Sequence, residues 1–202
     1  MDKKLIQIFQ DRGCLQISKT NSFTYASGLT GPIYCDNRLI LGDFQLRNLV
    51  KENLIQLIKS SSFQFEGIMA MATGAIAIGA ALADELEIPF GYIRSVKKGH
   101  GKGELIEGGV SKEKRILIFE DLINQGSSVL QGVEALREAN YQIAGVLSIV
   151  NYGFSKPAKI FQTEKLKIES LISFKDLIEY FDQEDKTGQI VQSLMHWHQS
   201  IN

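Results

Sequence analysis

The stretch at residues 116–128, ILIFEDLINQGSS, constrains the fold more than any other part of the chain. It opens with four apolar residues, Ile116–Phe119, ahead of two acidic ones. A continuous apolar run is typical of a parallel strand that is buried on both faces, whereas a half-exposed strand alternates. A polar loop follows at Asn124–Ser128, and an apolar helical pattern starts at Val129. The stretch therefore predicts a strand, a loop and a helix of an α/β sheet.

The same stretch suits a phosphorylated sugar. Gly126, Ser127 and Ser128 stand where the helix begins, and a helix N-terminus aims backbone N–H groups at a phosphate. Glu120 and Asp121 are adjacent at the end of the strand, where two carboxylates suit the hydroxyl pair of a sugar, directly or through a metal. The alternative is a buried strand and a capped helix of an α/β protein that binds no such ligand.

Composition limits the classes of protein to consider. The 202 residues are enough for one α/β domain with a small appendage. A net charge of −1 gives no electrostatic case for DNA or RNA binding, which needs a basic face. Cys14 and Cys35 are too few for a disulfide framework or a zinc site, so we expect reduced thiols in a cytoplasmic protein. We expect no signal peptide and no membrane span, because even the most apolar stretch, Gly67–Leu82, is short and glycine-rich.

Apolar periodicity predicts alternating strands and helices over most of the chain. The expected strands are residues 67–72, 90–94, 116–119, 143–150 and 168–172. The expected helices are residues 5–12, 44–59, 74–86, 129–139, 157–163, 174–180 and 188–200, the second capped by Asp43. This order predicts a doubly wound, mostly parallel sheet. We expect residues 1–42 to form a helix and a flap (residues 14–41) beside the carboxyl edge of the sheet, in one domain with an α/β core at 43–202.

A second candidate segment, Arg94–Gly108, is glycine-rich and basic and reads RSVKKGHGKGELIEG. Glycines let a backbone move and cations attract a polyanion, so such a loop can close over a pyrophosphate and exclude water. The alternative is a solvated surface loop. A P-loop does not fit, because Gly103 follows Lys102 where serine or threonine is required. The chain has no strand–GxGxxG–helix unit, which argues against a nicotinamide dehydrogenase.

A third segment, Phe23–Arg38, reads FTYASGLTGPIYCDNR. The three segments together resemble type I phosphoribosyltransferases, which use phosphoribosyl pyrophosphate (PRPP), and among them the orotate phosphoribosyltransferases. Their flap pattern has its counterpart at Phe23, Ser27, Gly28, Pro32, Tyr34, Asp36 and Arg38. Their basic-loop and strand–Ala-Thr-Gly–helix patterns are matched at Arg94, Lys98, His100, Gly101 and Ala72-Thr73-Gly74. The matched segments follow the order of the family and cover most of the chain.

The resemblance implies a reaction, a cofactor and an assembly. A ring nitrogen of a base displaces pyrophosphate from the anomeric carbon of PRPP, and Mg²⁺ is held mainly by substrate oxygens and waters. Because the basic loop reaches the neighbouring subunit's site in this family, a homodimer is implied. Asp121 would help stabilise the cationic ribose, and Arg94, Lys98 and His100 would neutralise the leaving group, with Lys97 and Lys102 in support.

The resemblance also assigns binding residues. The implied PRPP-binding residues are Thr73, Gly74, Arg94, Lys97, Lys98, His100, Glu120, Asp121, Asn124, Gln125, Gly126, Ser127 and Ser128. The implied base-binding residues are Ala26, Tyr34, Cys35, Asn124 and Tyr152.

Several positions depart from the family pattern. Ala26 stands where the flap usually has lysine, and Ser95 stands where the basic loop usually has lysine. Asn124 replaces a threonine, and Tyr152 replaces an arginine that meets the carboxylate of the base. Arginine and a carboxylate pair through two charge-assisted hydrogen bonds, whereas tyrosine offers one neutral hydroxyl. Two alternatives therefore stay open, a PRPP-dependent transferase for a different base and a non-catalytic PRPP-sensing regulator on the same fold.

His196 and His198 flank Trp197 in the last predicted helix. Residues i and i+2 do not share a helix face, so we expect no metal site there, and we expect Trp197 to be packed in the interior.

Overall fold

The computed structural model describes residues 3–18, 23–25, 28, 30–94 and 105–202. Its centre is a six-stranded sheet of β5 (Gly67–Met71), β6 (Phe90–Ile93), β7 (Ile106–Glu107), β8 (Arg115–Ile123), β9 (Gln142–Asn151) and β10 (Ile168–Ser173). The strands lie in the order β10-β9-β8-β5-β6-β7. All neighbours are parallel except β6 and β7. The predicted doubly wound, mostly parallel sheet is therefore confirmed.

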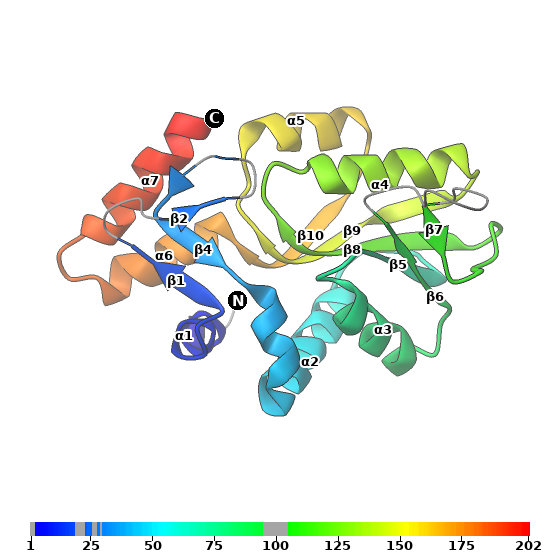
Figure 1. The fold of residues 1–202 in the computed structure, drawn as a ribbon, viewed down its shortest axis with the longest axis horizontal. Helices are drawn as coiled ribbons and strands as arrows, with labels where there is room; N and C mark the ends of the chain where they lie inside the picture. The colour runs from blue at the N-terminus through cyan, green and yellow to red at the C-terminus, as the bar shows by residue number, and fades with distance from the viewer. Residues whose placement is uncertain (1–2, 19–22, 26–27, 29, 95–104) are drawn as a thin grey trace.

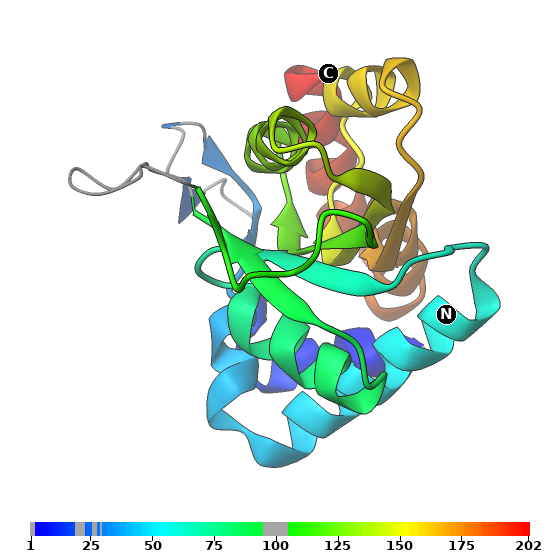
Figure 2. The same cartoon turned by 90° about the vertical axis from the view of Figure 1, so that its right-hand side faces the viewer.

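Helices cover both faces of this sheet. Figure 1 shows α2 (Phe44–Ser60) and α3 (Ile76–Glu85) on one face, and α4 (Ser127–Glu138) and α5 (Ser155–Thr163) on the other. Figure 2 shows the same layers from the β7 edge. The predicted cap of α2 is confirmed, because the Asp43 carboxylate accepts hydrogen bonds from the N–H groups of Gln45 and Leu46.

The order of the strands creates a crevice at one point of the sheet. The chain leaves β5 through α3 to reach β6, and it leaves β8 through α4 to reach β9 on the opposite side. Because β5 and β8 are neighbours, the two connections diverge from adjacent carboxyl ends. Open α/β sheets bind ligands at such a topological switch point. The segments that follow β5 and β8 are Ala72-Thr73-Gly74 and Asn124–Ser128, two of those singled out in the sequence.

The N-terminal and C-terminal segments gather at one end of the molecule (Figure 1). They are α1 (Lys3–Asp11), β1 (Leu15–Ile17), β2 (Phe23–Thr24), β3 (Thr30–Gly31), β4 (Ile33–Cys35), the 3₁₀ helix η1 (Asn37–Gly42), α6 (Phe174–Glu184) and α7 (Gln189–Ile201). In the flap, β1 pairs with β4 and β2 pairs with β3, both antiparallel. One cluster of buried apolar side chains runs from Leu5 and Ile33 through Leu147 of the sheet to Trp197 of α7. The flap and the sheet thus share a core.

Two elements differ from the sequence-based expectation. Strand β8 does not end at Phe119 but continues to Ile123, so the acidic pair lies within the strand. Pairing continues because Glu120 and Leu122 remain in register with Ser148 and Val150 of β9. Strand β7 lies at the end of the segment that we expected to be a loop, where it pairs with β6 at the edge of the sheet.

Candidate active site

The acidic pair lies at the carboxyl end of β8. Glu120 is buried, with 6% of its surface exposed, and its Oε2 accepts a hydrogen bond of 2.7 Å from Ser128 Oγ. Its Oε1 accepts one of 3.0 Å from the Asp121 N–H. Burial and the neighbouring Asp121 carboxylate raise the pKa of Glu120, although the Ser128 bond lowers it. In the ligand-free protein a proton is therefore favoured on this pair.

The loop after β5 lies against the acidic pair. The Asp121 carboxylate fills the space beside Gly74, which leaves no room for a side chain at position 74. The Ala72–Thr73 peptide bond is cis, and Ala72 N–H donates to the carbonyl of Ile93 on β6. Helix α3 follows with Ala75 as its N-cap, and no side chain caps its first N–H groups. An anion can therefore meet both the backbone of this loop and the positive end of a helix.

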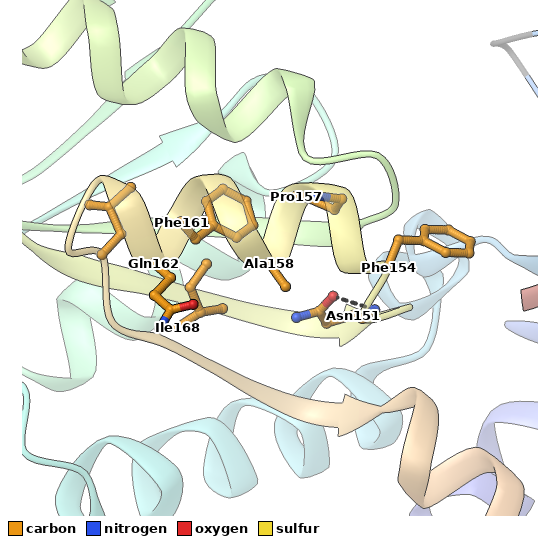
Figure 3. A pocket seen from close by; sticks show the side chains of 9 residues that line it. Asn151, Phe154, Pro157, Ala158, Phe161, Gln162 and Ile168 are labelled. Carbon is orange, nitrogen blue, oxygen red and sulfur yellow. Dashed lines mark hydrogen bonds between the residues drawn. The ribbon is translucent and has the colours of Figure 1, made fainter. Parts of the chain in front are cut away.

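Helix α4 begins in the same way on the other side of the crevice. Its N-cap is Gly126, with φ 71° and no capping side chain. A Cβ atom on Gly126 would lie 2.8 Å from Pro157 and 2.9 Å from Phe161, two residues of α5 that Figure 3 labels. Glycine is thus required at this position by the backbone angle and by the close approach of α5. The exposed N-terminus of α4 forms a second place for an anion, next to the acidic pair.

The polar residues of this loop do not all face a ligand. Ser127 is exposed, whereas the hydroxyl of Ser128 donates to Glu120. Asn124 and Gln125 are partly buried. Gln125 Nε2 is buried and has no hydrogen-bond partner within the part of the chain that the structure describes. It is therefore a donor that a bound anion can use.

The flap is attached to the acidic pair through a residue that the sequence analysis missed. Asn37 is 4% exposed, and its Nδ2 donates a 2.7 Å hydrogen bond to the Asp121 carbonyl. Cys35 Sγ in turn donates to Asn37 Oδ1 at 3.3 Å. The only sequence signal for Asn37 is its place between Asp36 and Arg38, two positions of the flap pattern.

Tyr34, Cys35 and Tyr152, three of the expected base-binding residues, lie at this end of the molecule. The Tyr34 ring stacks on Phe23 with 5.6 Å between the ring centroids. Cys35 is buried, and burial raises the pKa of its thiol, with a further contribution from the nearby Asp121. Tyr152 follows β9 and is completely buried, and its N–H donates to the Ile123 carbonyl of β8. Ala26 lies outside the described residues.

Arg94 is the one expected pyrophosphate ligand of the basic loop that the structure describes. Its backbone N–H donates to the Leu105 carbonyl, and its guanidinium lies 3.8 Å from the Glu107 carboxylate. With Met71, Ser128 and residues of α4 it lines a cavity of about 340 Å³. Lys97, Lys98, His100 and Lys102 lie outside the described residues.

Comparison with known proteins agrees with this geometry. Residues 44–182 match the family described as Phosphoribosyl transferase domain. The chain belongs to the phosphoribosyltransferase family. This assignment confirms the predicted type I phosphoribosyltransferase fold.

Within the phosphoribosyltransferases, the similarity to named relatives extends along the whole chain. It is 36% identical to the orotate phosphoribosyltransferase of Staphylococcus epidermidis over 100% of both chains. It is 34% identical to that of Listeria monocytogenes, over 98% of this chain and 95% of the relative. The crystal structure of orotate phosphoribosyltransferase from Aeropyrum pernix, 25% identical, superposes with a TM-score of 0.76 over 89% of this chain and 98% of that one.

Two further observations concern the expected cofactor and location. Among the described residues, no group of three or more His, Cys, Asp or Glu side chains is arranged to hold a metal ion. Within the same residues, no helix of this phosphoribosyltransferase has the length and apolar character needed to cross a membrane.

Proposed function

We propose that the protein is an orotate phosphoribosyltransferase, which converts orotate and PRPP into orotidine 5′-phosphate and pyrophosphate. The observation that carries the proposal is an acidic pair between two uncapped helix N-termini, in a chain similar to orotate phosphoribosyltransferases along its full length. This arrangement offers one place for each phosphorylated end of PRPP and two carboxyl groups between them.

The parts of PRPP can be assigned to these places. The 5′-phosphate binds at the N-terminus of α4, where Asn124, Gln125, Gly126 and Ser127 offer backbone N–H groups and side-chain donors. The pyrophosphate binds at the loop of Thr73 and Gly74 before α3. Glu120 and Asp121 bind the ribose hydroxyls. Ser128 contributes by holding the Glu120 carboxyl group in place.

The remaining cations would act on the leaving group. Arg94 reaches the crevice from the end of β6, and Lys97, Lys98 and His100 belong to the basic loop that follows, with Lys102 in support. Their positive charge favours the departing pyrophosphate, because charge develops there as the bond breaks. In a homodimer this loop would serve the partner's site.

The reaction exchanges one bond at the anomeric carbon for another. The bond from this carbon to the pyrophosphate oxygen breaks, and a bond to a ring nitrogen of orotate forms while that nitrogen loses its proton. The ribose becomes cationic on the way, so the Asp121 carboxylate stabilises the transition state more than the ground state. Tyr34, Cys35, Asn124 and Tyr152 are the proposed contacts of the base.

Mg²⁺ fits the residues that are present. Mg²⁺ is commonly bound by one or two carboxylates together with substrate phosphates and water, rather than by an all-protein cage. The acidic pair would supply such a carboxylate beside the substrate oxygens and waters, and the described residues contain no larger cluster of ligands. When bound, the ion would neutralise charge on the pyrophosphate. A cytoplasmic location is part of the same proposal.

A steady-state assay with a panel of bases tests the proposed function. Purified protein is incubated with PRPP and Mg²⁺, and orotate, uracil, adenine, guanine and hypoxanthine are compared by loss of base and release of pyrophosphate. We expect turnover with orotate and none above background with the purines. Turnover with a different base alone would show that the protein is a phosphoribosyltransferase for that base and not for orotate. PRPP binding without any turnover would favour the PRPP-sensing regulator.

A further inference from the structure

The turn between β9 and α5 is held in one conformation by several hydrogen bonds. Asn151 Oδ1 accepts a 2.8 Å hydrogen bond from the Gly153 N–H, which Figure 3 shows as a dashed line. The Tyr152 N–H donates to β8, and the Ser155 N–H donates to Asn202 Oδ1. Asn151, Gly153 and Phe154 line a cavity beside α5, which Figure 3 shows from close by. Position 152 is thus fixed from both sides of the turn.

His198 of α7 contacts the carbonyl group of Tyr152, whose N–H group bonds to β8. Its Nε2 lies 2.8 Å from the Tyr152 carbonyl oxygen, which can only accept, so Nε2 carries the proton. Its Nδ1 accepts a 2.9 Å hydrogen bond from Asn202 Nδ2. The ring lies between Phe174, with centroids 4.0 Å apart, and Phe154, at 4.9 Å, nearly parallel to both. His198 is therefore held in a single orientation by stacking and by a bond at each ring nitrogen.

Tyr152 connects this contact to the candidate active site. Its ring meets Trp197 edge-on, with centroids 5.5 Å apart. Its hydroxyl is buried and has no hydrogen-bond partner among the residues that the structure describes. Burial raises the pKa of this hydroxyl, with further contributions from Cys35, Tyr25 and Tyr34 of the flap, and burial together with Asp121 raises the pKa of the Cys35 thiol. A buried hydroxyl without a partner is costly, which points to a polar group that it meets when the site is filled.

We propose that His198 is a positioning residue for the base side of the site, acting through its hydrogen bond to the Tyr152 backbone. The proposal rests on the proposed function, because it requires Tyr152 to lie beside the acceptor base. It concerns a residue outside the four segments that resemble the family, at residues 23–38, 72–74, 94–108 and 116–128. It predicts an effect on the base and not on PRPP, since the hydrogen bonds and ring contacts that the structure gives for His198 are with Tyr152, Asn202, Phe154, Phe174 and Trp197, none of which belongs to the proposed PRPP site.

The test compares four variants of the full-length protein. His198→Ala removes the donor, and His198→Gln places an amide N–H near the position of Nε2. His198→Asn places its amide near Nδ1, too short to reach the Tyr152 carbonyl. His196→Ala is the matched control, because His196 is exposed on the same helix. The KM values for orotate and PRPP, kcat and the melting temperature are measured for each.

We expect His198→Ala and His198→Asn to raise the KM for orotate about five- to tenfold, the effect of losing one hydrogen bond. The KM for PRPP should stay within about twofold. His198→Gln should recover most of the loss, and His196→Ala should match the wild type. The proposal is overturned if both KM values rise together, if the KM for orotate is unchanged, or if His198→Gln is no better than His198→Asn.

Tryptophan fluorescence provides a second measurement, independent of turnover. Trp197 is the single tryptophan of the chain and lies against both Tyr152 and the His198 ring, so the informative comparison is between His198→Gln and His198→Asn, which both remove that ring. We expect the emission of these two variants to differ, with that of His198→Gln closer to the wild type. If the wild type uses no orotate, the proposed function fails, and the fluorescence comparison still decides whether His198 positions Tyr152. Identical spectra for these two variants would overturn that role.

Discussion

Gly74 and Asp121 approach each other so closely that a Cβ atom on residue 74 would lie 2.2 Å from Asp121 Oδ2. Gly74 precedes α3 and Asp121 lies near the end of β8, so this contact joins the two sides of the crevice. The backbone N–H of Leu122 also donates a 3.0 Å hydrogen bond to Asp121 Oδ1, which helps to fix the carboxylate. The position of the carboxylate thus depends on the absence of a side chain at 74.

Gly74→Ala should therefore impair catalysis more than folding. The added methyl group forces the Asp121 side chain away, and a displacement of about 1 Å at a reacting centre can lower the rate about 100-fold. We expect kcat/KM for PRPP to fall by about that factor, with a nearly unchanged melting temperature. Gly42→Ala is the matched control, because nothing lies within 4 Å of a Cβ there. Equal activity of both variants would contradict the contact.

Glu120→Gln should change the dependence of stability on pH. Burial raises the pKa of Glu120 from an ordinary 4.5 to about 8, so the folded protein holds this proton more tightly than the unfolded chain. The contribution of Glu120 to stability is then complete below about pH 4.5 and is lost as the pH rises towards 8. Relative to the wild type, the variant should gain on the order of 2 kcal/mol in free energy of unfolding between pH 5 and 8.

Urea unfolding of the ligand-free proteins at the two pH values measures this difference. Other groups titrate over the same range, and comparison of variant with wild type removes their common contribution. A difference that is constant with pH would mean that Glu120 is ionised in the folded protein.

Asn37→Ala should loosen the flap from the active site. The change removes the 2.7 Å hydrogen bond to the Asp121 carbonyl and leaves that acceptor without its side-chain partner. We expect the free energy of unfolding to fall by about 1–3 kcal/mol, measured by urea denaturation, together with a loss of kcat/KM. Asn53→Ala is a suitable control, because Asn53 Nδ2 bonds within its own helix to the Leu49 carbonyl. If Asn53→Ala lost as much activity, the attachment through Asn37 would have no special role.

Gly126→Ala should weaken PRPP binding at the N-terminus of α4. The substitution places a β-carbon in a left-handed conformation and within 3 Å of Pro157 and Phe161, so the phosphate loop must shift. We expect the KM for PRPP to rise at least tenfold, roughly the effect of 1.4 kcal/mol. Gly188→Ala has a similar φ of 66° at the start of α7 but open space around it, so it isolates the cost of the backbone angle. A rise of the same size in both would exclude the contact with α5 as the cause.

The sequence predicted the sheet well because its strands and helices depend on local pattern. Apolar runs located the strands, and glycine with serine marked the start of α4 at the carboxyl end of β8. The length of β8 could not be predicted in the same way, because Glu120 stays in the strand by pairing with Ser148 of β9, while its buried carboxyl group bonds to Ser128 and to the Asp121 N–H. When strands are predicted from apolar runs, a strand is expected to end at the first charged residue, even if its carboxyl group is buried in the folded protein.

Contacts between distant segments were the part that the sequence could not supply. Asn37 lies 84 residues from the Asp121 carbonyl that it binds, and His198 lies 46 residues from Tyr152. Neither pair has a periodicity or spacing that indicates its partner, since each depends on how the flap and α7 pack on the sheet. The expectation that His198 forms no metal site remains consistent with its two hydrogen bonds, one at each ring nitrogen.

Replacement of Asp121 by asparagine tests the central claim most directly. The change keeps the shape of the side chain and removes the negative charge that faces the ribose cation. With PRPP, Mg²⁺ and orotate, we expect kcat/KM to fall by about two to three decades, as when one preorganised electrostatic partner is removed. The melting temperature should change little. Turnover of Asp121→Asn at the wild-type rate would contradict the assignment of this acidic pair as the centre of the reaction.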